Sequence, residues 1–249
     1  MMFSSVYDFK DFYNSPSGQV VKTLVSGHIR AWWPNLTGLR VVGIGYAQPY
    51  LTPFLNEAER CIAINPARRG ACHWPLEQKN LTVLAEESEL PLETNSVDRV
   101  LLIHSLEYAE LFHSNLQEVW RVLKSNGRVL IVTPNRMGLW ARSDWSPYGQ
   151  GTPYSIDQLR WLLRDCQFTF ERSRSALYVP PLRWRLVQKA ANGFERFLPY
   201  VMHGLGGLHI IEASKQLYAG TQVPVVSKMI VRGPVKLRQN PVPTSRNPV

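Results

Sequence analysis

The chain has 249 residues, of which 45% are hydrophobic and 19% are charged, so it can bury a substantial core. This composition excludes collagen-like, coiled-coil and wholly disordered proteins. Three cysteines without a Cys-x-x-Cys pair form no disulfide framework, and residues 1–14 lack the pattern of a signal peptide. We therefore expect a cytoplasmic protein.

Charge is divided unevenly along the chain. Residues 1–133 carry 12 basic and 13 acidic side chains, whereas residues 134–249 carry 16 basic and 6 acidic ones, and the whole chain has a formal net charge of +9. The basic half favours contact with an anionic membrane surface, an acidic partner, a nucleic acid or an anionic substrate. Solvated arginines that only keep the protein soluble are the alternative.

The first half of the sequence alternates helical patterns with short apolar runs. Val20, Val21, Leu24, Val25 and Ile29 recur at helical spacing after Ser17, which can cap a helix. In chain order, the patterns predict a helix over 15–33, a strand over 39–44, a helix over 50–59, strands over 60–64, 81–84 and 98–103, a helix over 116–123 and a strand over 128–133.

Apolar strands that alternate with helices indicate parallel strands buried on both faces. The predicted fold class is α/β, with a doubly wound, mostly parallel, Rossmann-like sheet and helices on both faces. Such sheets bind ligands beyond the carboxyl ends of their strands, near the point where the strand order reverses.

The second half gives a less regular pattern. It predicts a helix over 155–165 capped by Ser155, strands over 168–178 and 208–213, and a basic amphipathic stretch over 183–200. We expect one domain over 1–233, with a core over 38–170, a basic extension or lid over 171–233, and a disordered Pro-rich tail over 234–249.

A turn rich in small residues follows the first predicted strand. Gly43, Gly45 and Ala47 would let backbone N–H groups approach a ligand closely, and the next helix would direct its N-terminus at that ligand. A tight turn without a ligand would produce the same pattern.

The stretch 86–108, EESELPLETNSVDRVLLIHSLEY, is more specific, as is the stretch 116–135, LQEVWRVLKSNGRVLIVTPN. Together they resemble the class I S-adenosylmethionine-dependent methyltransferases, in the branch that acts on small molecules and quinones. An acidic residue, Leu-Pro, an Asp before an apolar strand and a His-x-Leu-Glu segment carry the resemblance, which covers roughly residues 38–170. It implies a methyltransferase fold with S-adenosylmethionine as cofactor.

The resemblance places cofactor contacts at ten positions. Glu86 matches the acidic residue that contacts the adenine, and Gly45 matches a glycine of the first motif. Asn65 replaces the usual ribose-binding acidic residue, and Ala47 and Pro49 replace glycines. The implied cofactor-binding set is Gly43, Gly45, Tyr46, Ala47, Asn65, Glu86, Glu87, Ser88, Ile103 and His104.

Methyl transfer to a hydroxyl or carbon acid is helped by a general base, and His104 is the candidate, ahead of Glu107 and His113. Because the motifs of nucleic-acid base methyltransferases are missing, the expected acceptor is a small or lipid-like molecule. A catalytically inactive binding or scaffold protein that uses its basic half, and an RNA methyltransferase, are the alternatives. Cys72-His73 lacks the spacing of metal ligands, so no metal site is predicted.

Overall fold

The computed structural model describes residues 3–181 and 205–217. The chain divides into two compact units, residues 1–217 and 218–249, and everything below concerns the first. The predicted basic stretch over 183–200 and the predicted tail over 234–249 lie outside the described residues.

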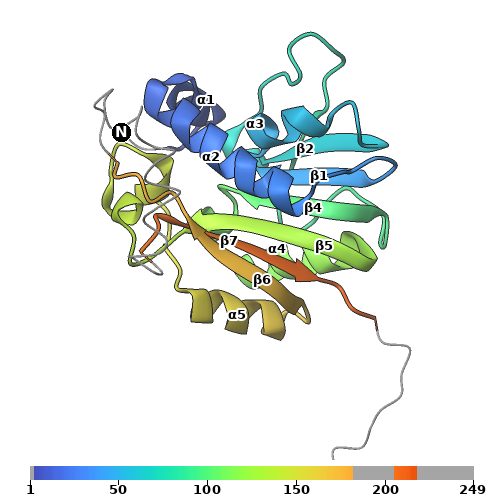
Figure 1. The fold of residues 1–249 in the computed structure, drawn as a ribbon. Coiled ribbons are helices and arrows are strands. Elements are labelled where there is room, and N and C mark those ends of the chain that lie inside the picture. The colour runs from blue at the N-terminus through green and yellow to red at the C-terminus, as the bar shows by residue number, and fades with distance from the viewer. Residues whose placement is uncertain (1–2, 182–204, 218–249) are drawn as a thin grey trace, which may run out of the picture. The chain divides into compact units, whose positions relative to one another are not determined.

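A seven-stranded sheet forms the centre of the unit (Figure 1). Its strand order is β3-β2-β1-β4-β5-β7-β6; β1 to β5 pair in parallel, and β7 runs antiparallel to both β5 and β6. The strands are β1 (Arg40–Gly45), β2 (Arg60–Pro66), β3 (Thr82–Ala85), β4 (Val97–Ile103), β5 (Leu123–Pro134), β6 (Thr169–Ala176) and β7 (Leu208–Ser214). The predicted doubly wound, mostly parallel sheet is confirmed.

Two apolar layers cover the two faces of the sheet. Successive residues of β1 alternate between them, so Val41 packs in one layer while Val42 and Ile44 pack in the other. The first layer includes α1 (Val6–Asn14), α2 (Pro16–Trp32) and α3 (Gln48–Leu51), and the second includes α4 (Phe112–Val122) and α5 (Ile156–Asp165). Figure 1 shows α1 and α2 on one side of the sheet and α4 on the other. Burial on both sides explains why the central strands are almost wholly apolar.

Short 3₁₀ helices occupy the connections: η1 (Thr52–Phe54), η2 (Ala67–Arg69), η3 (Leu106–Tyr108), η4 (Leu139–Arg142) and η5 (Pro147–Gly149). The predicted helix over 50–59 is wrong, because α3 ends at Leu51 and only η1 follows it. Pro53 explains the early end, since a proline inside a helix lacks an N–H group and crowds the preceding turn.

The two N-terminal helices meet at a tight corner. Ser15, rather than the predicted Ser17, is the N-cap of α2, and its Oγ accepts a hydrogen bond from the Gly18 backbone N–H at 3.1 Å. A Cβ at Gly18 would lie 2.0 Å from the Phe12 carbonyl oxygen, so only glycine permits the close approach of α2 to α1. Helix α1 was not predicted, although Val6, Phe9, Phe12 and Tyr13 form its buried face.

A buried carboxylate joins the N-terminal helices to the antiparallel end of the sheet. Glu212 in β7 is fully buried. One of its oxygens accepts a hydrogen bond from the Trp33 indole N–H at 2.8 Å; the other pairs with Arg128 at 2.9 Å and Arg172 at 2.7 Å. The carboxylate is therefore compensated on both oxygens, which a buried charge requires.

We expect Glu212→Ala to lower the free energy of unfolding by about 2 kcal/mol, because it leaves the Trp33 N–H buried without an acceptor and leaves two arginines unpaired. Urea denaturation followed by tryptophan fluorescence measures the change. Glu171→Ala is the matched control, since Glu171 on the neighbouring strand is exposed and should cost less than 1 kcal/mol. Equal losses for the two variants would contradict the assignment.

Within the described ranges, no helix is both long and apolar enough to cross a membrane.

Candidate functional site

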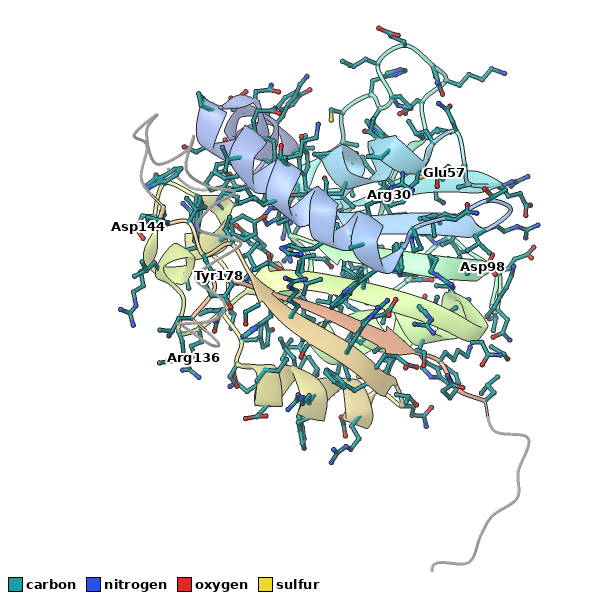
Figure 2. The ribbon with its side chains drawn as sticks, viewed as in Figure 1. Arg30, Glu57, Asp98, Arg136, Asp144 and Tyr178 are labelled. Atoms are coloured by element: carbon teal, nitrogen blue, oxygen red, sulfur yellow. The ribbon has the colours of Figure 1, made fainter. Side chains whose placement is uncertain are left out.

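The order of the strands places the candidate site at the carboxyl ends of β1 and β4. These two strands are neighbours, and the sequence order reverses between them, which is where open α/β sheets bind ligands. The ends of β2 and β3 lie next along the same edge. Figure 2 labels Asp98 and Asp144 at opposite ends of the sheet; Asp144 lies on the side of the candidate site.

The turn after β1 packs directly against the end of β4. The Tyr46 backbone N–H donates to the Ile103 carbonyl at 2.7 Å. Gly45 has a φ of +90°, and a Cβ there would lie 2.2 Å from the same carbonyl oxygen. A Cβ at Gly43 would lie 2.6 Å from the Cβ of Ala47. Both glycines are thus required by contacts within the chain, and their role in cofactor binding stays a prediction.

Asn65 ends β2 beside the first turn of α3. It is 2% exposed, and its side-chain oxygen accepts a hydrogen bond from the Gln48 Nε2 at 2.6 Å. The Gln48 side-chain oxygen is also buried and has no hydrogen-bond partner. An unpaired buried acceptor costs free energy, so this oxygen is suited to a donor on a ligand.

The side chain of Arg69 extends from the segment after β2 to the segment after β4. Its Nη1 donates to the His104 carbonyl at 2.5 Å, and its guanidinium lies 4.3 Å from the centre of the Tyr108 ring. The residue is 8% exposed, its Nη2 has no partner, and burial lowers its pKa. Sequence analysis missed Arg69, and no sequence signal identifies it because its partner is 35 residues away.

His104 occupies the centre of the site with a strained backbone, since its φ is +53°. The ring is fully buried; Nε2 lies 2.8 Å from the Tyr13 hydroxyl, and Nδ1 lies 3.2 Å from the Glu107 carboxylate. Burial lowers the pKa of His104, and Glu107 opposes that shift. The neutral ring therefore donates from Nδ1 to Glu107 and accepts from Tyr13. Both nitrogens are engaged, so a general-base role for His104 stays a prediction.

Aromatic side chains of α1 cover this edge. The Phe9 ring stacks on the Tyr46 ring with 5.4 Å between their centroids, and its centroid lies 5.0 Å from that of the His104 ring. The Tyr13 hydroxyl also bonds to the hydroxyls of Tyr50 and Tyr148, each at 2.9 Å. The three hydroxyls and the histidine form one buried network, in which burial raises the pKa of each tyrosine. Helix α1 thus belongs to the site as well as to the core.

The residues after β3 divide into one buried and two accessible positions. Glu87 is buried, accepts a hydrogen bond from the Ser105 hydroxyl, and has its pKa raised by burial. Glu86 is exposed and Ser88 half-buried; both line a pocket of about 90 Å³ together with Arg68 and Glu110. Glu86 is therefore accessible, and its contact with the cofactor stays a prediction, whereas Glu87 fixes the loop after β4.

The other predicted candidates lie apart from this network. His113 pairs with Asp165 at 3.2 Å near Cys166, on the face of the sheet covered by α4 and α5. The described ranges contain no group of three metal-ligating side chains, and Cys72-His73 forms no such site.

Comparison with known protein families matches part of the chain. A family model described as a methyltransferase domain matches residues 39–131, which extend from the start of β1 into β5. This segment is similar to that family. The whole fold is that of the class I S-adenosylmethionine-dependent methyltransferases, as the sequence predicted. No curated protein matches the chain.

Solved methyltransferase structures share the fold at low sequence identity. One from Thermotoga maritima is 14% identical, with a TM-score of 0.61 over 85% of this chain and 96% of that one. One from Archaeoglobus fulgidus is 18% identical, with a TM-score of 0.54 over 78% and 94%. One from Haloferax volcanii, in complex with the Trm112 methyltransferase activator, is 18% identical, with a TM-score of 0.54 over 78% and 89%.

The methyltransferase domain implies S-adenosylmethionine as the cofactor, and the edge described above fits it chemically. The cofactor carries a purine amino group, ribose hydroxyls and a charged amino-acid end. Glu86 and Ser88 line an accessible polar pocket, while Gln48, Arg69 and Glu107 each keep a buried polar atom without a partner. Unpaired buried groups of both donor and acceptor kind are what a polar ligand requires.

Buried neutral histidines make the fold sensitive to acid. Burial lowers the pKa of His209 from its ordinary 6.5 to about 4 and also lowers that of His104. Between pH 6.5 and about 4 the unfolded chain binds protons that the folded chain does not. As the pH falls through this window, we expect the free energy of unfolding to fall by about 1.4 kcal/mol per pH unit because of His209. The lowered pKa of His104 acts in the same direction.

Denaturation curves measured across this pH window test the expectation. His209→Leu should flatten the dependence relative to the unaltered protein, whereas His73→Leu, a change at an exposed histidine, should leave it unaltered. A His209 variant with an undiminished slope would refute the assignment.

Proposed function

We propose that the protein transfers a methyl group from S-adenosylmethionine to a small or lipid-like acceptor. The observation that carries the proposal is the set of unpaired buried polar atoms of Gln48, Arg69 and Glu107, gathered at the strand-order reversal of a methyltransferase domain. Such atoms cost stability unless a ligand satisfies them.

Different residues of the chain would contact different parts of the cofactor. Glu86 accepts from the purine amino group at the pocket after β3, and Ser88 adds contacts there. The Gln48 oxygen accepts from a ribose hydroxyl next to Asn65, in place of the usual acidic residue. The bound cofactor supplies the reactive methyl group, so the protein has only to position the acceptor and exclude water.

His104 would position neighbouring groups through its two hydrogen bonds. Its Nδ1–H is directed at Glu107 and its Nε2 at the Tyr13 hydroxyl, so it holds α1 over the edge of the sheet. The rings of Phe9, Tyr13 and Tyr46 then exclude water from the end of β4.

The loop after β5 supports an apolar acceptor. Trp140 and Tyr148 are buried, and Tyr148 lies 4.7 Å from the His104 ring between centroids. The half-buried Trp145 lies 6.2 Å from Phe12 of α1. Aromatic surface at this end of the sheet favours an acceptor with an apolar body.

Calorimetric titration with S-adenosylmethionine and S-adenosylhomocysteine tests the proposal. We expect micromolar binding of both, weakened about tenfold by Glu86→Ala, because a charged acceptor is worth about 1.5–3 kcal/mol in a hydrogen bond. Glu77→Ala removes an exposed carboxylate outside the pocket lining and should leave the affinity unchanged. No binding at millimolar ligand would overturn the proposal.

One observation favours a second candidate, a catalytically inactive binding protein. The Tyr46–Ile103 and Arg69–His104 hydrogen bonds use polar groups at the carboxyl ends of β1 and β4 that a cofactor would otherwise contact. The basic half, with 16 basic and 6 acidic residues, would then bind an acidic partner or an anionic membrane surface. Absence of cofactor binding, together with salt-dependent binding to anionic vesicles, is the result this candidate requires.

A further inference from the structure

A second pocket lies on the face of the sheet covered by α4 and α5, and the hydroxyl of its Tyr154 donates to the Leu106 carbonyl at 3.3 Å. It has a volume of about 450 Å³ and is lined by Phe112, Tyr154, Asp157, Gln158, Trp161 and Leu162. Its walls come from the start of α4, the loop before α5 and the first two turns of α5. This volume is within the range of small-molecule sites.

Phe112 and Tyr154 are half-buried against the core, so Trp161 is the ring of the lining that the core does not explain. Leu159, Leu162 and Leu163 form the buried face of α5, whereas Trp161 is 61% exposed. Leu111, the residue before Phe112, is 64% exposed. An exposed aromatic ring that lines a pocket can contact a ligand there.

Three aromatic rings and one carboxylate determine what this pocket prefers. Phe112, Tyr154 and Trp161 present π-systems, whose faces carry negative electrostatic potential. Asp157 is the one charged residue of the lining, and it is acidic. An organic cation with an apolar shell satisfies both features, and quaternary ammonium groups are the ligands that aromatic cages recognise.

The contacts around the pocket leave Asp157 accessible. Arg160 approaches its carboxylate at 3.5 Å, but the Asp157 side chain is 85% exposed and the Arg160 guanidinium lies 4.8 Å from the centre of the Phe170 ring. A surface ion pair of this kind contributes at most about 1 kcal/mol. His113, 6.2 Å from Trp161 between ring centroids, pairs with Asp165.

We propose that this pocket binds a quaternary ammonium compound through the rings of Phe112, Tyr154 and Trp161 and the carboxylate of Asp157. The pocket shares no lining residue with the proposed cofactor contacts, so this proposal does not rest on them. Its partner is therefore a small organic cation, whichever reaction the methyltransferase domain performs.

Choline and 3,3-dimethylbutan-1-ol are the probes, because they share one shape and differ in the positive charge. Calorimetry at about pH 8, where histidine side chains are ordinarily neutral, should give choline a dissociation constant of about 1 mM or lower. The neutral alcohol should bind at least tenfold more weakly. Equal binding of the two probes, or binding of neither, would overturn the proposal.

Substitutions in the lining test whether choline binds in this pocket. Trp161→Ala should weaken choline binding at least tenfold, Trp161→Phe should retain most of it, and Asp157→Asn should weaken it about fivefold. Asp144→Asn changes an exposed aspartate in the loop after β5, labelled in Figure 2, and should have no effect. Choline affinity that is unchanged in Trp161→Ala would place the binding elsewhere and refute the assignment, and unchanged unfolding curves show that the variants fold.

Discussion

The hydrogen bond between the Tyr13 hydroxyl and His104 Nε2 joins helix α1 to the end of β4, and the arrangement of the whole carboxyl edge depends on it. It fixes the imidazole between Tyr13 and Glu107, and it places Phe9 over Tyr46 and beside Arg69. Because every member of the network is buried, each hydrogen bond is made in a medium of low dielectric constant, where a missing partner is costly. The helix and the strand end are thus positioned as one structure.

The sequence predicted the sheet well because its signals are local. The apolar runs in β1, β2 and β4 are short and β-branched, and burial on both faces demands that pattern. The capping box of α5, in which Ser155 and Gln158 satisfy each other's backbone groups, is equally local and marked the helix start. Pro53 is a local signal as well, and it accounts for the absence of the predicted helix over 50–59.

The site was predicted only in part, because most of its contacts are long-range. Glu86, Asn65 and His104 were predicted through the family resemblance, and their contacts with the cofactor stay predictions. Arg69 could not be found in that way, since its role arises from a carbonyl 35 residues away. Helix α1 had a usable signal, with Val6, Phe9 and Tyr13 at helical spacing, but nothing in the sequence connects it to residues 104 and 148.

The contacts of α1 also determine when the site can form during folding. Tyr13 reaches His104 across 91 residues and Tyr148 across 135, and the Phe3 backbone N–H donates to Gln150 across 147. Closing loops of this size costs entropy before any contact compensates for it. The pairings among β1 to β5 span at most 58 residues, as Val41 does with Arg99, so these strands can pair while α1 is still unattached. The polar edge therefore needs residues 148 and 150, and a ribosome-bound chain must extend beyond residue 150 before this edge can close.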